Sequence, residues 1–88
     1  MKYKIGYYPG AVREYKKLSP LLQEKVKEIF ELLKDKKNHE KIKVHKLKGR
    51  LQNHFSCSVD YSNRIIFYFK NDEVRIVSIG SHDIYKNF

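Results

Sequence analysis

The sequence predicts a small α+β domain in which two helices precede an antiparallel sheet. Apolar residues recur at helical spacing in the first third of the chain, and after residue 54 they alternate or form a continuous run, as in strands. A length of 88 residues allows one compact core and no second domain. We therefore expect a single domain over residues 1–88, with the element order β-α-α-β-β-β and an N-terminal helical hairpin packed on the sheet.

The N-terminal part is expected to form one strand and the two helices. Apolar and other side chains alternate over residues 3–7, which is strand periodicity, and Pro9-Gly10 should end that strand. Helical spacing over residues 11–18 predicts a short first helix. Ser19-Pro20 is a helix start signal, because serine can cap free backbone N–H groups and proline suits the first turn. An amphipathic second helix should run from there to about Lys36.

The C-terminal part is expected to form three strands. Residues 55–61 alternate between apolar and polar, which predicts a strand with one buried and one polar face. Residues 65–69 are continuously apolar, as in a central strand covered on both faces, so their aromatic rings should pack. Residues 70–73 resemble a tight hairpin. A last strand should cover residues 74–79 and end at Gly80.

Positive charge is the strongest global feature. Nineteen Lys and Arg against ten Asp and Glu give a net charge of +9. Residues 37–50 form a basic, loop-like stretch, and from Lys34 to Arg50 eight Lys or Arg accompany only two acidic residues. Such a surface attracts polyanions, which include nucleic acid, an acidic membrane or an acidic protein partner.

Several function classes are disfavoured. Cys57 is the single cysteine and lies in an apolar alternation, so we expect a core residue and no disulfide or Cys-based metal site. The four histidines lack helical metal-binding spacing, and no Gly-rich loop is present for a cofactor. The chain shows neither a signal-peptide pattern nor a membrane-length apolar run, so we expect a cytoplasmic protein without a membrane partner.

Two clusters offer groups for RNA cleavage without a metal, at residues 45–50 and 80–85. In such cleavage the ribose 2′-OH attacks the adjacent phosphate. A base must accept its proton, an acid must protonate the leaving 5′-oxygen, and cations must stabilise the phosphorane charge. His, Tyr, Lys and Arg suffice for these roles.

Three segments together resemble the RelE/ParE superfamily of toxins: His45–Gly49, Asp60–Tyr68 and Ile79–Tyr85. They are most similar to its YafQ-like branch, in which a strand ending in Gly-Thr/Ser-His precedes a C-terminal aromatic residue. The resemblance covers nearly the whole chain and rests on the order and spacing of the segments. It implies a RelE-like fold and the toxin of a type II toxin–antitoxin system. It also implies a ribosome-dependent mRNA endonuclease, without cofactor, that forms a hetero-oligomer with an acidic antitoxin.

The resemblance also implies residue roles. His82 matches the histidine after the last strand, a general acid or base, and Tyr85 lies where members carry a C-terminal aromatic residue. His45 opens the His-x-Leu-x-Gly stretch, and Arg64 matches the arginine at the head of the central strand. The residues expected to bind RNA are Lys46, Lys48, Arg50 and His54.

Two departures leave the division of roles open. Ser56 stands roughly where many members carry Arg, and Val59 lies near the position of a second catalytic histidine. His54 is a neighbouring substitute for that histidine.

Two other functions remain open at this stage. A ParE-like toxin on the same fold inhibits DNA gyrase instead of cutting RNA, and fold alone does not separate the two. A non-catalytic nucleic-acid-binding module would explain the charge. The acid–base set of His82, Tyr85 and His45 favours the nuclease.

Overall fold

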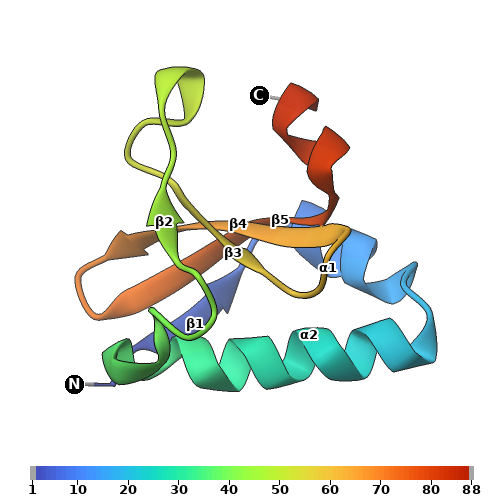
Figure 1. Cartoon of the computed structure of the whole chain (residues 1–88), viewed down its shortest axis with the longest axis horizontal. Helices are drawn as coiled ribbons and strands as arrows, with labels where there is room; N and C mark the ends of the chain where they lie inside the picture. The colour runs from blue at the N-terminus through green and yellow to red at the C-terminus, as the bar shows by residue number, and fades with distance from the viewer. Residues whose placement is uncertain (1, 88) are drawn as a thin grey trace.

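A five-stranded mixed sheet forms the middle of the molecule, and helix α2 lies along one of its faces (Figure 1). The computed structural model describes residues 2–87, and the side chains of His82, Lys86 and Asn87 lie outside the described part. The strand order is β1-β5-β4-β3-β2. The strands are β1 (Lys4–Tyr7), β2 (His45–Lys46), β3 (Phe55–Ser58), β4 (Asn63–Lys70) and β5 (Glu73–Ser81).

The helical hairpin and the α+β class are confirmed, with shifted boundaries. Helix α1 spans Pro9–Lys16 and α2 spans Pro20–Leu33. The Ser19 hydroxyl accepts a hydrogen bond from the Leu22 N–H, at 3.3 Å, and so caps α2 as expected. Strand β1 ends at Tyr7, just before Pro9-Gly10, as expected, and this pair also opens α1, because proline suits the first helical turn. Three short 3₁₀ helices complete the chain: η1 (Lys36–Asn38), η2 (Gly49–Leu51) and η3 (His82–Asn87).

The prediction of a purely antiparallel sheet is wrong at one pairing. Strand β1 pairs in parallel with β5, whereas the other neighbouring strands pair antiparallel. Side-chain alternation reports which face of a strand is buried but not its direction, so the sequence pattern could not reveal this pairing. The two-residue strand β2 was also missed, because it is too short to show periodicity.

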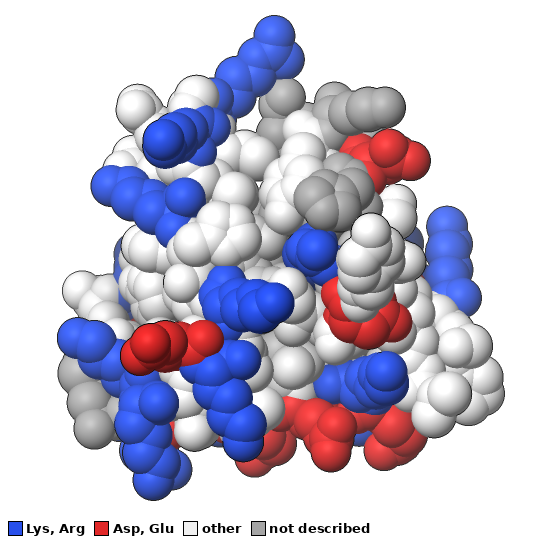
Figure 2. Space-filling model, viewed as in Figure 1, with Lys and Arg blue, Asp and Glu red and all other residues white. Residues whose placement is uncertain are grey.

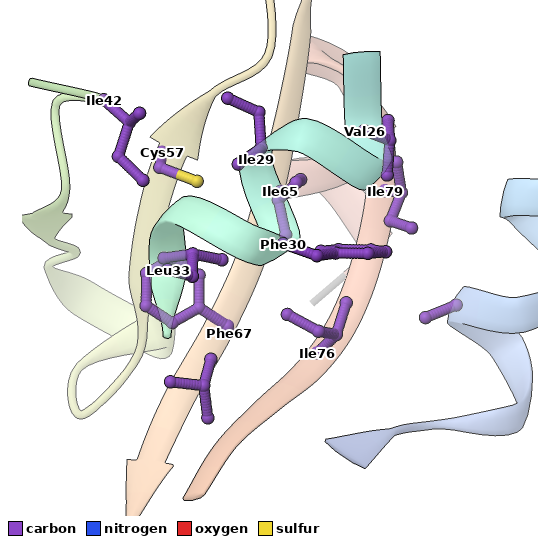
Figure 3. Packing of buried hydrophobic residues seen from close by; sticks show 12 residues of the cluster. Val26, Ile29, Phe30, Leu33, Ile42, Cys57, Ile65, Phe67, Ile76 and Ile79 are labelled. Atoms are coloured by element: carbon purple, nitrogen blue, oxygen red, sulfur yellow. The ribbon is translucent and has the colours of Figure 1, made fainter. Parts of the chain in front are cut away.

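The main core lies between α2 and the sheet (Figure 3). The α2 residues Val26, Ile29, Phe30 and Leu33 face apolar side chains of β4 and β5, including Phe67. As expected for a central strand, consecutive residues of β4 are fully buried on both faces: Ile65, Ile66 and Phe67. A second, smaller cluster covers the opposite face of the sheet and consists of Leu47, Leu51, Ile66, Val77, Ile84 and Tyr85.

Strand β5 contains a bulge opposite Ile66 and Phe67 of β4. Ile66 pairs with Ser78 and Phe67 with Ile76, so one residue of β5 lies between two consecutive pairs. Strand β1 pairs with β5 only as far as Ile76. Beyond that point Glu14 of α1 accepts hydrogen bonds from the Ser78 hydroxyl, at 3.0 Å, and the Ile79 N–H, at 3.1 Å. Helix α1 therefore covers the part of the strand edge that β1 leaves open.

Within residues 2–87, no helix is both long and apolar enough to cross a membrane.

Candidate functional site

The candidate site lies on the sheet face opposite α2, near the segments of η2 and η3 (Figure 1). Paired residues on neighbouring strands point to the same side of a sheet. The pairing register therefore defines rows of side chains that cross this face, which we call the open face. One row contains His45, Ser56 and Ile66, and the next contains Ser58, Arg64 and Gly80.

Tyr85 joins the first of these rows from η3. Its hydroxyl lies 2.7 Å from the hydroxyl of Ser56, whose side chain is fully buried. His45 pairs with Ser56 from the other side, across β2 and β3. Two residues that are 40 positions apart in the chain, His45 and Tyr85, therefore flank the same serine.

The tautomer of His45 is defined by its hydrogen bond. Its Nδ1 lies 3.0 Å from the backbone carbonyl oxygen of Lys43, which can only accept. Nδ1 must therefore carry the proton in the neutral ring, and Nε2 keeps a lone pair. Because the side chain is exposed, this lone pair is available to a substrate as a base.

Arg64 braces the turn that joins β3 and β4. Its Nη1 donates to the backbone carbonyls of Asp60, at 2.6 Å, Tyr61, at 3.2 Å, and Asn63, at 3.0 Å. The same residue pairs with Gly80, two positions before η3 begins at His82. Arg64 thus stabilises the β3–β4 turn through these hydrogen bonds and also lies beside η3, the segment that carries the candidate catalytic residues.

His82 begins η3, but its side chain lies outside the described part of the structure. The backbone in front of it differs from the prediction, since β5 continues through Gly80 to Ser81. Gly80 does not end the strand but allows a close contact with η3. A Cβ at this position would lie 2.5 Å from Cγ2 of Ile84, so only glycine lets η3 fold back this closely onto the strand.

The basic residues of the β2–η2 segment surround a hollow of about 300 Å³, lined by Lys46, Leu47, Lys48, Gly49 and Gln52. Arg50 follows on η2 and is also exposed. Figure 2 shows lysine and arginine side chains that project from this upper part of the molecule, and further ones that lie among the acidic side chains of the lower part. The predicted cationic residues Lys46, Lys48 and Arg50 therefore share one surface.

His54 lies apart from these cations, in a third row of the open face. Its ring packs edge-on against Tyr68, with ring centres 5.4 Å apart. Its Nδ1 is buried and has no hydrogen-bond partner among the described residues. The structure therefore separates His54 from the basic hollow with which it was grouped.

Sequence reasoning missed three residues of the open face: Tyr8, Tyr68 and Arg75. The hydroxyls of Tyr8 and Tyr68 are 2.8 Å apart, and Arg75 pairs with Tyr68 across β4 and β5. The sequence did contain a signal, because successive side chains of a strand point to opposite faces, so Tyr68 lies on the other face of β4 from Phe67 and Phe69. The continuous apolar run concealed that alternation.

Cys57 lies in the core cluster between α2 and the sheet. Burial raises the pKa of the Cys57 thiol to about 12, so it remains protonated and is no nucleophile at neutral pH. Among the side chains that the structure describes, no group of three or more His, Cys, Asp or Glu residues is placed to hold a metal ion.

The arrangement of helices and mixed sheet is that of the RelE-like toxins. YafQ from E. coli superposes with a TM-score of 0.75 at 17% identity, over 96% of this chain and 98% of that chain. The YoeB–YefM complex from Staphylococcus aureus gives 0.77 at 22% identity, over 93% and 99%. The archaeal RelE–RelB complex from Pyrococcus horikoshii gives 0.73 at 19% identity, over 92% and 96%. These likenesses confirm the predicted RelE-like fold.

The sequence defines the family more narrowly. The family model for YafQ, a bacterial toxin of type II toxin–antitoxin systems, matches residues 3–86. The chain belongs to this toxin family, which confirms the expected membership. No curated protein matches the chain.

Proposed function

We propose that this toxin is an endoribonuclease that cuts mRNA on the ribosome and so stops translation. The observation that carries the proposal is the convergence at one corner of the open face. His45 and Tyr85 flank Ser56, Arg64 lies in the next row, and η3 begins beside it. The hollow lined by residues 46–49 and Gln52 directly follows His45 in the chain, and its lysine side chains can bind phosphate.

The proposed reaction needs no metal as catalyst. The 2′-oxygen attacks the adjacent phosphorus while its proton passes to Nε2 of His45. The bond from phosphorus to the 5′-oxygen then breaks, and that oxygen takes a proton from His82 or Tyr85. The products are a 2′,3′-cyclic phosphate and a 5′-hydroxyl. Lys46, Lys48 and Arg50 stabilise the charge on the phosphorane.

Replacement of His82 and His45 tests the proposal. His82→Ala and His45→Ala should each lower the rate of ribosome-bound mRNA cleavage by about 10²- to 10⁴-fold, the usual loss for a general acid or base. The double variant should lose less than the product of the two effects, because the residues act in one step. His45 is exposed, so His45→Ala should change the free energy of unfolding by less than about 0.5 kcal/mol.

The pH dependence provides a second readout. The wild-type rate should be bell-shaped in pH, and each single variant should lose one limb. Cleavage by both single variants at the wild-type rate contradicts the assignment, and His54 then becomes the candidate base. Intact mRNA together with a DNA-damage response would instead indicate the gyrase-inhibiting function.

We also propose that the chain binds an acidic antitoxin in the cytoplasm and forms a hetero-oligomer with it. The net charge of +9 supports this, since complementary charge speeds association and makes its rate sensitive to salt. Membership in a two-component toxin family also supports it. The product of the adjacent gene should co-purify with the toxin and restore growth. Failure of any such partner to suppress toxicity contradicts this proposal.

A further inference from the structure

A polar aromatic group occupies the open face beyond the candidate catalytic corner. It consists of His54, Tyr68, Tyr8 and Arg75, and we call it the tyrosine row. Tyr68 pairs with Arg75 on β5, which in turn pairs with Gly6 on β1, just before Tyr8. His54 contacts Tyr68 from the opposite side. The row therefore crosses the sheet from the start of β3 to the end of β1.

The row lies within reach of the same RNA strand as the catalytic corner. Tyr68 follows Ile66 by two positions on β4, and Ile66 pairs with Ser56. Two residues of a strand span about 7 Å. Ile66 and Ser56 are themselves fully buried, so a nucleotide at the corner contacts the exposed His45 at the end of their row. The next nucleotide along the strand then lies toward Tyr68, which is half-buried on the same face.

The rings are held in position but remain accessible. The Tyr8 ring stands at 88° to the Tyr68 ring with centres 6.2 Å apart, and their hydroxyls are hydrogen-bonded. Tyr8 is 39% exposed, as is the side chain of Arg75. The hydrogen bond with Tyr68 raises the pKa of Tyr8, so the Tyr8 hydroxyl keeps its proton at physiological pH. Two rings oriented in this way can stack on a base.

Arg75 is positioned beside the rings by Glu73. The Nε of Arg75 donates to a carboxylate oxygen of Glu73, and the Glu73 side chain lies over Gly6. A Cβ at Gly6 would approach that carboxylate to 2.9 Å, so glycine leaves the room that the ion pair occupies. A guanidinium fixed in this way can stack on a base or bind a phosphate.

We propose that the tyrosine row is a second nucleotide subsite, which stacks an unpaired base adjacent to the cleaved bond and so contributes to sequence preference. Aromatic side chains on an open sheet face, flanked by an arginine, are the usual means of binding single-stranded RNA through its bases. The inference rests on the proposed nuclease function. It adds the base-binding part, which the cations of the β2–η2 segment do not supply.

A short RNA that cannot be cut isolates this subsite. In a six-nucleotide single strand with methylated 2′-oxygens, one base at a time is removed while every phosphate stays. For the wild type, removal of one particular base should weaken binding by about 5- to 150-fold, the loss expected for one base–aromatic stack. In Tyr68→Ala and Tyr8→Ala this dependence should largely disappear.

Two kinds of control variant accompany this test. Tyr61→Ala removes a tyrosine that is 95% exposed in the β3–β4 turn, and it should bind like the wild type. Tyr68→Phe and Tyr8→Phe keep the rings without the hydroxyl pair, and they should retain most of the base dependence. Thermal unfolding of each variant checks that it is folded. If Tyr68→Ala does not fold, Tyr8→Ala, a change at an exposed position, still tests the subsite.

The outcomes separate this inference from the proposed function. RNA binding with the expected base dependence but no mRNA cleavage supports the subsite and contradicts the nuclease. Cleavage with the same base preference in wild type and Tyr8→Ala contradicts the subsite alone. If the alanine variants weaken antitoxin binding and leave RNA binding unchanged, the row is a protein interface and the inference is overturned.

Discussion

The hydroxyl pair of Ser56 and Tyr85 connects the C-terminal segment to the middle of the sheet. The two oxygens are 2.7 Å apart, and the Ser56 side chain is fully buried. Tyr85 also packs in the small cluster with Ile66 and Ile84. A tyrosine in this position both fixes η3 and presents a phenol to the candidate site, so its structural and chemical roles must be separated by experiment.

A double-mutant cycle separates these roles. Tyr85→Phe leaves the buried Ser56 hydroxyl without this partner and should destabilise the protein by about 1 kcal/mol. Ser56→Ala together with Tyr85→Phe should cost less than the sum of the single changes, with a coupling of about 1 kcal/mol in urea unfolding. If the phenol moves a proton, Tyr85→Phe slows cleavage strongly while Ser56→Ala, which keeps the phenol, does not. Equal rates for the two variants contradict a chemical role.

At the scale of single residues, the sequence predicted which side chains lie in the main core, but not the surroundings of the side chains on the open face. The apolar periodicity correctly marked Cys57 and Phe67 as core residues. Ser56 was assigned to the polar face of its strand, yet it is buried, because η3 folds over it from 29 positions further along the chain. Tyr68 was hidden inside an apolar run. Both errors arise from contacts between distant segments, which local periodicity does not contain.

The β3–β4 turn is the element that holds Arg64 in place. Oδ1 of Asp60 accepts hydrogen bonds from the backbone N–H groups of Ser62, at 2.9 Å, and Asn63, at 2.8 Å. The Asn63 side-chain amide donates to the same oxygen, at 3.0 Å. Burial alone would raise the pKa of Asp60, but these hydrogen bonds outweigh it and lower the pKa overall. The ionised carboxylate therefore stabilises the folded turn.

This turn should lose stability in acid. Because the pKa of Asp60 is lower in the folded than in the unfolded state, its contribution is present above the unfolded value of about 4 and disappears as pH falls through the folded value. Asp60→Ala should lower the free energy of unfolding by about 1 kcal/mol at pH 7, and Asp60→Asn by less, since its amide oxygen still accepts. Urea unfolding at several pH values tests this. A difference between wild type and Asp60→Asn that stays constant down to pH 2 contradicts it.

The close contact between β5 and η3 should be sensitive to a single methyl group. Gly80→Ala places a Cβ against Cγ2 of Ile84 and should cost about 1–3 kcal/mol. It should also displace η3 and slow cleavage by up to about 10²-fold. Ile84→Leu removes Cγ2 and should partly rescue both defects.

Gly10→Ala is the matched control for this contact. Its Cβ would meet only Arg13, at 3.8 Å, within α1, and alanine favours helices, so the change should be neutral or slightly stabilising in thermal unfolding. Equal stability of Gly80→Ala and wild type would show that η3 is not held by this contact.

Elements with strong local signals were predictable, whereas their arrangement was only partly so. The cap at Ser19, the apolar run of β4 and the turn at Asn71, whose φ is +56°, each follow from local chemistry. The parallel pairing of β1 with β5 depends on how the helical hairpin returns the chain to the sheet. The extension of β5 to Ser81 depends on Glu14 and Ile84, which contact it from other elements.

Across the whole molecule, acidic and basic side chains are unevenly distributed between the layers. The two helices carry four glutamates and the same number of basic residues: Glu14, Glu24, Glu28 and Glu31, with Arg13, Lys16, Lys25 and Lys27. Residues 41–50, which carry β2 and lead into η2, contain five Lys or Arg and no acidic residue. The resulting field directs a polyanion toward the β2–η2 side of the molecule.

Two triple variants of equal charge distinguish local phosphate contacts from net charge. Replacement of Lys46, Lys48 and Arg50 by glutamine lowers the net charge from +9 to +6, and replacement of Lys16, Lys17 and Lys27 on the helical layer does the same.

The first variant should lose up to three phosphate contacts on a single-stranded RNA that cannot be cut. Each contact contributes about 0.7 to the slope of log affinity against log salt, so that slope should fall by about 2. The helical-layer variant should keep most of the slope, because beyond about 8 Å its charges are screened at physiological ionic strength. Fluorescence anisotropy of labelled RNA from 50 to 300 mM salt measures both slopes. Equal reductions would show that RNA responds to net charge alone and would remove the β2–η2 segment from the proposed site.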